Sequence, residues 1–279
     1  MVTLVRSDGM KFAYGDIFNI LSYGLTGTGA LSMEIFSEKK AQGDGNEITA
    51  KRATPRTIDI HAVCVHRSAN RIARRVANKF FSPVYEYEFH IDYKGTRAWI
   101  PCHLEAFELP TENIHRPQIL KVSLFCPDPF YLSEDSYGKN IAQVTGMIGF
   151  PYIDLPRIGF IASVFNFSQS VFIQNNGDVN TYPVIEITAK GEVENPEIQK
   201  DEYFVRVLDT MRNGDKIIID FNTKRVTKND ENISNKLSKD SRLTRISFER
   251  GTNRISYAAA HGENVMNVFV YFNERYVGV

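Results

Sequence analysis

Apolar and polar residues alternate over much of the first half of the chain, and this alternation predicts β-strands. From Tyr85 to Tyr93 every second residue is aromatic or aliphatic, which is the period of a strand with one buried face. Lys94-Gly95 is a turn signal, so Arg97 to Phe107 is expected to return as the second strand of a hairpin. Thr57 to Val65 and Ile119 to Phe125 follow the same pattern and complete a predicted sheet.

One stretch has helical periodicity instead, and it predicts a single helix near 68–81. Ser68 is a suitable N-cap, and Pro83 follows the expected end. The stripe predicted to be buried consists of Ala69, Ile72, Ala73, Val76 and Phe80. Basic residues, including Arg71, Arg74 and Arg75, gather on the other side. Such a face usually contacts solvent, although it can also meet an acidic neighbour or a nucleic acid.

A charged segment at 37–51 follows a strand-like run and contains Gly43, Asp44 and Gly45 near its centre. Polar glycine tips between strand-like flanks are typical of a long hairpin or arm. A disordered surface loop is the alternative.

Two prolines interrupt the chain directly after the predicted strand at 119–125. Proline fixes φ, lacks an amide proton and favours an extended conformation in the residue before it. We therefore expect a rigid strap between two domains, composed of Phe125, Cys126, Pro127, Asp128, Pro129 and Phe130. An ordinary strand end that carries two prolines is the simpler alternative.

The second half reads as short strands separated by turns. Residues 133–147 are polar and poorly periodic, as in a linker between domains at 1–132 and 148–279. Asn176-Gly177-Asp178 and Asn213-Gly214-Asp215 are expected hairpin turns. The predicted strands, which together suggest an antiparallel β-sandwich, are Ser163–Phe167, Ser170–Gln174, Val184–Ala189, Tyr203–Leu208, Lys216–Phe221, Arg245–Phe248, Arg254–Tyr257 and Val265–Phe272.

Composition narrows the functional classes. A length of 279 residues suits two domains, and the balance of 33 basic against 33 acidic residues argues against dedicated DNA binding. Cys64, Cys102 and Cys126 are scattered, which argues against a disulfide framework or a zinc site. The sequence has no secretory signal pattern and no apolar run of membrane-spanning length, so synthesis in the cytoplasm with reduced thiols is expected.

No catalytic or metal-binding pattern stands out. The six histidines, His61, His66, His90, His103, His115 and His261, form no recognised ligand motif. Asp128 with Asp135, or Glu192 with Glu194, have no evident placement across a sugar ring. We therefore predict no enzyme activity, no metal and no cofactor.

Sugar binding is a separate possibility, because β-sandwiches often carry it on an exposed aromatic ring. The single tryptophan, Trp99, lies in the first domain. A site in the second domain would have to use a phenylalanine or one of Tyr182, Tyr203, Tyr257 and Tyr271, most of which fit strand interiors better.

Four motifs in order carry a resemblance to a known family. They are the strap at 125–130, the Gly177–Ile187 run with its Tyr182-Pro183-Val184 centre, the Gly251–Ile255 turn, and the ending Glu274–Val279. In this combination the chain resembles the distal tail protein (Dit) family of long-tailed bacteriophages and prophages.

The resemblance implies a structural protein of the phage tail tip, or baseplate, that takes part in host attachment. Six copies would form a ring with a central channel for DNA. The N-terminal domain, a split-barrel or sheet with one packed helix, would build the ring, and a galectin-like sandwich would follow. Implied partners are the tail tube protein and the tail-associated tip (Tal-like) protein, with a receptor-binding protein as a further candidate, in a virion assembled in the host cytoplasm.

The strap residues match the family motif and are expected to fix the angle between the domains. Gly43, Asp44 and Gly45 are assigned to an intersubunit arm by position, and Arg71, Arg74 and Arg75 are candidate contacts on the helix. The alternative function is a monomeric carbohydrate-binding protein of the cell surface. A cell-wall hydrolase is a third hypothesis.

Overall fold

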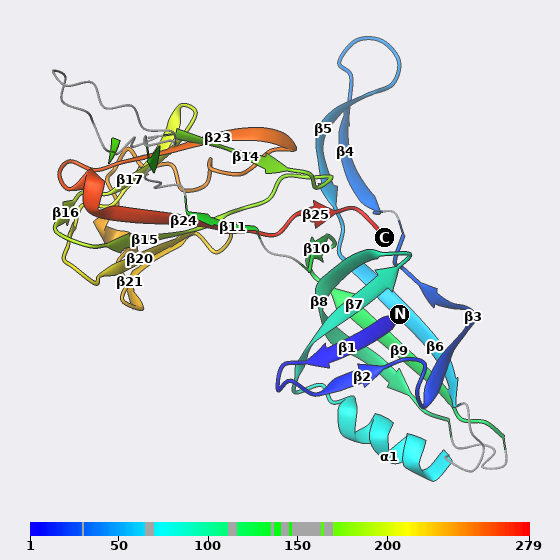
Figure 1. Cartoon of the computed structure of the whole chain (residues 1–279). Helices are drawn as coiled ribbons and strands as arrows, with labels where there is room; N and C mark the ends of the chain where they lie inside the picture. Colours follow the sequence, from blue (N-terminus) through cyan, green and yellow to red (C-terminus); the bar gives the residue numbers. More distant parts are fainter. Residues whose placement is uncertain are drawn as a thin grey trace, which may run out of the picture. The chain divides into compact units, whose positions relative to one another are not determined.

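The structure, a computed structural model, describes residues 1–29, 31–64, 70–110, 116–134, 137–140, 145–146, 163–164 and 170–279. It divides the chain into two units (Figure 1). The first unit comprises Met1–Glu134 together with Arg275–Val279, and the second comprises Asp135–Glu274. The second unit is thus an insertion near the end of the first, which differs from the tandem arrangement expected from the sequence.

The main part of the first unit is an antiparallel sheet of nine described strands. Seven strands pair in the order β2-β1-β7-β8-β9-β6-β3, while β10 pairs with both β8 and β25. The strands are β1 (Val2–Arg6), β2 (Lys11–Ala13), β3 (Phe18–Thr26), β6 (Arg56–Cys64), β7 (Glu86–Tyr93), β8 (Thr96–Glu108), β9 (Ile119–Cys126), β10 (Tyr131–Ser133) and β25 (Arg275–Tyr276).

Alternation explains why these strands have one buried face. In β6 every second side chain from Ile58 to Cys64 is buried, as the sequence predicted. The predicted hairpin of β7 and β8 is confirmed, with Tyr93 opposite Thr96 across the turn. Tyr93 itself is 57% exposed, so the expected inward stripe ends at Ile91. The reason is that Tyr93 adjoins the Lys94-Gly95 turn, beyond the reach of the core.

Helix α1 (Asn70–Phe80) packs on this sheet, and the prediction of one α-helix with the sheet is confirmed. Its buried side chains are Ala73, Ala77 and Phe80, with Val76 partly buried beside them. The prediction that Ile72 is buried is wrong, because its side chain is 61% exposed. Residues at i, i+3, i+4 and i+7 from Ala73 already form the inner stripe, and Ile72 falls outside it. The predicted N-cap Ser68 and the stripe residue Ala69 lie outside the described residues.

The charged segment at 37–51 belongs to a hairpin, as predicted. Strands β4 (Met33–Lys39) and β5 (Asn46–Ala53) form a two-stranded sheet of their own, which extends away from the nine-stranded sheet (Figure 1). We call residues 33–53 the arm. At its tip Gly43 and Gly45 have φ values of 92° and 89°, which glycine adopts without strain.

Two antiparallel sheets share one core in the second unit, so the predicted sandwich is confirmed. Its core includes Ile185 and Ile219 from the larger sheet and Ile173, Ile198 and Ile255 from the smaller one. The larger sheet, in the order β11-β24-β15-β20-β21-β22, contains β11 (Tyr137–Asn140), β15 (Val184–Ala189), β20 (Lys216–Asp220), β21 (Arg225–Lys228), β22 (Glu231–Asn232) and β24 (Met266–Phe272).

The smaller sheet of the second unit has the order β14-β23-β17-β18. Its strands are β14 (Ser170–Asn175), β17 (Glu197–Lys200), β18 (Tyr203–Arg206) and β23 (Gly251–Ala258). Two short pairs join β12 (Thr145–Gly146) to β13 (Ser163–Val164) and β16 (Val193–Glu194) to β19 (Thr210–Met211). Single 3-10 turns occupy Ser234–Lys236 and Glu263–Val265.

Three expectations for the second unit are wrong. Asn213-Gly214-Asp215 does not close a hairpin, because β19 before it pairs with β16 and β20 after it pairs with β15 and β21. Arg245–Phe248 is not a strand, since only Phe248 forms a bridge, to Thr181. Asn176-Gly177-Asp178 does not close a hairpin, because β14 pairs with the distant β23. The turn there is stabilised instead by the buried side chain of Asn175, which donates to the carbonyls of Val179 and Phe248 at 3.2 and 3.1 Å. The predicted strand at 163–167 is described only for Ser163–Val164.

The predicted linker at 133–147 contains strand β11, which pairs with β24. Of the remaining linker residues, 135–136, 141–144 and 147 lie outside the described residues.

Candidate functional site

The strap at 125–130 leaves the end of β9 and is bonded to the C-terminal segment of the first unit. Cys126 and Pro129 are buried, whereas Pro127 and Asp128 are exposed. The Asp128 carboxylate accepts hydrogen bonds from Arg275 Nη2, at 2.7 Å to Oδ1, and from the Phe130 amide at 3.3 Å. The Arg275 guanidinium also lies 4.4 Å from the centre of the Phe130 ring. The strap and the C-terminal segment are therefore bound to each other through Asp128, Phe130 and Arg275.

Arg56, which the sequence analysis did not single out, adds further contacts to the C-terminal segment. Its side chain is only 8% exposed, and its Nη2 donates to the carbonyl of Val277 at 2.7 Å. Its Nη1 donates to the carbonyls of residues 27–29 at 3.1 to 3.3 Å. The Tyr131 ring lies 4.9 Å below the guanidinium. Arg56 begins β6 directly after the arm, so one side chain connects the base of the arm to the C-terminal segment.

Close backbone packing at Gly278 completes the contact. A Cβ atom at this position would lie 2.9 Å from the Gly29 carbonyl oxygen, closer than side chains tolerate. Two of the four motifs that carry the family resemblance, the strap and the chain's last residues, thus meet in the first unit. The sequence gives no sign of this contact, because Asp128 and Arg275 are 147 positions apart in the chain.

The strap cysteine has a packing role. Cys126 is buried, and its thiol is hydrogen bonded with that of Cys102, so that this bond and then burial raise the pKa of Cys102. Cys64, Cys102 and Cys126 are all buried and free of disulfides, as expected from their apolar surroundings.

The arm is exposed along most of its length, and only Glu34 and Ala53 are half-buried. Met33, Ile35 and Ile48 are 50%, 57% and 52% exposed, which is unusual for apolar side chains in a strand pair. A two-stranded hairpin is marginally stable by itself in water. The arm therefore has the properties of a segment that a partner covers.

The three arginines predicted as helix contacts differ in their surroundings. Arg74 donates to the Leu109 carbonyl and to Gln118 Oε1, both at 2.8 Å, and so holds α1 against the loop after β8. Arg71 and Arg75 are exposed and have no ion pair to any residue that the structure describes. These two remain candidate contacts, whereas Arg74 is engaged within its own chain.

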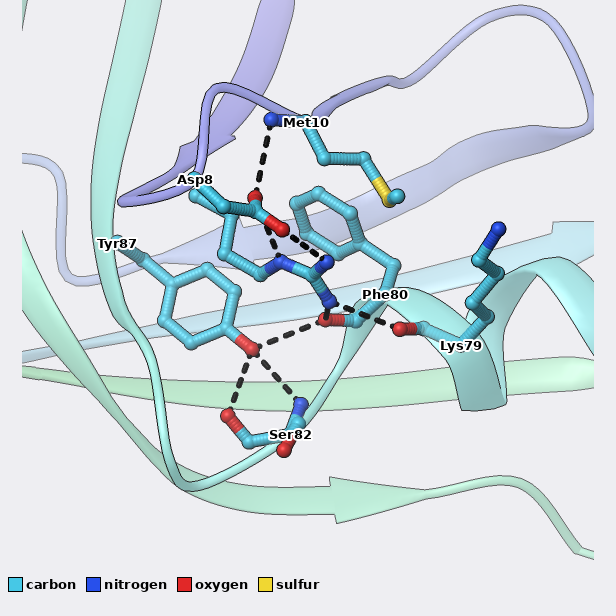
Figure 2. A network of polar contacts seen from close by, with 7 residues as sticks. Asp8, Met10, Lys79, Phe80, Ser82 and Tyr87 are labelled. Atoms are coloured by element: carbon cyan, nitrogen blue, oxygen red, sulfur yellow. Dashed lines mark hydrogen bonds and ion pairs between the residues drawn. The ribbon is translucent and has the colours of Figure 1, made fainter.

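A second anchor holds the C-terminal end of the helix, as Figure 2 shows. Arg6 Nη1 donates to the carbonyls of Lys79 and Phe80 at 2.8 and 3.0 Å, where a helix leaves its last carbonyls without partners. Asp8 accepts two hydrogen bonds from the same guanidinium, at 3.0 and 2.6 Å. The Tyr87 hydroxyl accepts from the Ser82 amide at 2.7 Å. Arg74 thus fixes the middle of α1 and Arg6 its C-terminal end.

Residues with catalytic potential do not converge in the described part of the chain. There, no group of three or more His, Cys, Asp or Glu side chains is arranged to hold a metal ion. His90 contacts Glu88 at 2.9 Å and stacks on Trp99, beside a hollow of about 240 Å³. His66 and His115 lie outside the described residues.

The tyrosines considered for sugar binding differ in how far they are exposed to solvent. Tyr257 is buried in the core of the second unit, whereas Tyr182 and Tyr271 are 39% and 37% exposed. Across the described residues, no helix has the length and apolarity needed to cross a membrane.

Comparison with known proteins relates part of the sequence to a family model and the fold to solved structures. Residues 176–276 match the model of the Siphovirus-type tail component, C-terminal domain. Comparison with curated protein sequences finds no relative.

Among solved structures, the Dit protein of phage SPP1, described as a paradigm of the hub adsorption apparatus of phages that infect Gram-positive bacteria, is similar with a TM-score of 0.68. The match has 14% identity and covers 99% of each chain. Chains of the phage p2 baseplate in its activated conformation are similar with TM-scores of 0.53. With calcium, identity is 8% and coverage 97% of each chain. With strontium, identity is 9%, and coverage is 97% of this chain and 98% of the other.

These matches confirm the resemblance to the distal tail protein family and the mainly β fold that it implied. They support a structural role in a phage tail.

Proposed function

We propose, from this similarity to distal tail proteins, that the chain forms a six-membered ring in the baseplate at the tip of a phage tail. The ring lies between the tail tube protein and the tail-associated tip protein, and DNA passes through its centre. The observation that carries the proposal is the tail-component family match over residues 176–276, joined to a Dit-like fold over 99% of the chain.

The first unit supplies the features that a ring subunit needs. Its arm exposes apolar side chains and unpaired strand edges, which a neighbouring copy can cover. In a closed ring every copy covers the strand edge of its neighbour, so no subunit keeps an uncovered edge.

The charge of the chain suits a conduit for DNA. Equal numbers of basic and acidic residues give no net charge, so the protein has no overall field that would retain a polyanion. In this role the chain binds no specific nucleic acid sequence and catalyses no reaction.

The strap sets the second unit's attachment to the ring, because Asp128 and Arg275 join the two segments through which the chain enters and leaves that unit. The second unit then serves as the platform for further tail-tip or receptor-binding proteins.

Native mass spectrometry of the full chain tests the proposal over a range of concentrations. We expect a species of six copies, alone or with the tail tube protein. A persistent monomer that binds glycans on an array would instead support the carbohydrate-binding alternative.

A further inference from the structure

The arm has two unlike faces, since side chains alternate along β4, and the extra residue at the register shift after Phe36 is Thr49 of β5. Glu34, Phe36 and Glu38 lie on one face, and Met33 and Ile35 lie on the other. Arg52, opposite Glu34, forms an ion pair with it at 2.7 Å and lies over the Phe36 ring. The register places Glu47 directly opposite Glu38 on the same face. We call Phe36, Glu38 and Glu47 the acidic face of the arm.

Glu38 and Glu47 are an unfavourable pair within a single copy. Both are exposed, and neither has an ion pair with any residue that the structure describes. Like charges directly opposite each other destabilise a strand pair. A cation supplied from outside would remove this repulsion.

Helix α1 has the complementary surface. Arg71, Arg75 and Lys79 are exposed and lie four residues apart, so they form one row about 12 Å long on the side away from the sheet. No ion pair joins this basic row to a carboxylate among the described residues. Ile72, 61% exposed, borders the row and gives it an apolar edge.

The basic row is also held in place before any partner binds. Arg74 fixes the middle of the helix to Leu109 and Gln118, and Arg6 binds its last carbonyls. Because these contacts already order the helix, binding a partner would cost little further ordering of its backbone.

We propose that the basic row of one copy receives the acidic face of the arm of a second copy. Two carboxylates and an apolar ring on the arm match three cations and an apolar edge on the helix. Figure 1 shows the arm and α1 at opposite ends of the first unit's sheet. A head-to-tail ring requires such a pair of different surfaces on each subunit. The inference rests on the proposed self-assembly and names the surfaces that make it.

Charge exchange tests the contact in the full-length chain. One variant carries E38K and E47K, and a second carries R71E and R75E. Each is expected to weaken self-association about tenfold or more, measured by analytical ultracentrifugation, because like charges then face each other. Mixing the two variants, or combining all four changes in one chain, should restore most of the lost association.

A matched control reverses two exposed cations of the second unit, in the variant carrying R225E and R254E. It changes the net charge as R71E and R75E do, and it should leave association unchanged. Thermal unfolding of every variant checks that the fold is retained.

The results separate this inference from the proposed ring. If the wild-type chain assembles and both reversals leave assembly intact, the assigned surfaces are wrong and the ring proposal stands. If the wild-type chain never assembles, even with the tail tube protein, both fail. Loss of binding to a double-stranded DNA probe in the R71E and R75E variant, with assembly unchanged, would overturn the inference in favour of a nucleic-acid surface.

Discussion

Buried or half-buried arginines hold the joints of the first unit. Arg6 binds the last carbonyls of α1, Arg56 binds the base of the arm and the C-terminal segment, and Arg275 binds the strap. Arg6 and Arg56 each donate from more than one nitrogen of a planar guanidinium, a geometry that lysine does not reproduce. Sequence alone does not distinguish these arginines from exposed ones, because each binds a carbonyl or carboxylate of a residue distant in the chain.

The Arg6–Asp8 pair predicts a specific acid dependence. Hydrogen bonds from Arg6 and then from the Met10 amide lower the pKa of Asp8 to about 2. A carboxylate with a depressed pKa in the folded state contributes stability above its unfolded value near 3.8, and it loses this contribution as pH falls towards 2.

We therefore expect D8N to lower the unfolding temperature at pH 7, and the difference from wild type to shrink steadily below pH 4. Thermal melts from pH 7 to pH 2 measure this. A constant difference across that range would show that the charge of Asp8 is not the cause.

Arg56 predicts the effect of a conservative change. R56K keeps the charge but leaves some of the carbonyls at Val277 and residues 27–29 without donors. It should cost about 1 to 3 kcal/mol of unfolding free energy. The matched control is R52K on the arm, whose exposed ion pair with Glu34 should matter by less than about 1 kcal/mol. Urea unfolding measures both, and equal costs would contradict the assignment.

At the scale of elements, periodicity predicted the long strands and the helix, and turn signals predicted two hairpins, whereas the pairing of strands distant in sequence was beyond it. Val184–Ala189 was located to the residue because its alternation is unbroken. Two-residue strands such as β16 and β25 carry no period to detect. Arg245–Phe248 has strand-like composition but lacks a full strand partner, and Ile72 is apolar yet exposed. Composition therefore identifies residues suited to a core without identifying those that reach it.

The candidate site was predictable in part for the same reason. The strap and the arm tip were identified by proline and glycine, whose backbone effects are local. The ion pair of Asp128 with Arg275, and the role of Arg56, depend on the chain's return to the first unit, which no local pattern indicates.

The arm predicts a change in hydrogen exchange on assembly. As an isolated two-stranded sheet it should exchange its amide protons rapidly in the monomer and slowly in the ring. Mass spectrometry of peptides covering 33–39 and 46–53 measures this, with β6 as a protected internal reference. Equal protection of the arm in monomer and ring would mean that no neighbour covers it.

At the scale of the whole molecule, the chain passes between its two units twice. The two passing segments pair with each other in both units, as β10 with β25 and as β11 with β24. Two segments of the chain, instead of one, thus connect the two units.

Negative-stain electron microscopy of the full chain, alone and with its tail tube protein, tests the central claim most directly. Self-assembly through the first unit predicts closed rings with six-fold symmetry and an open centre. Single particles of one subunit's size at every concentration, with no rings even beside the tail tube protein, would contradict it.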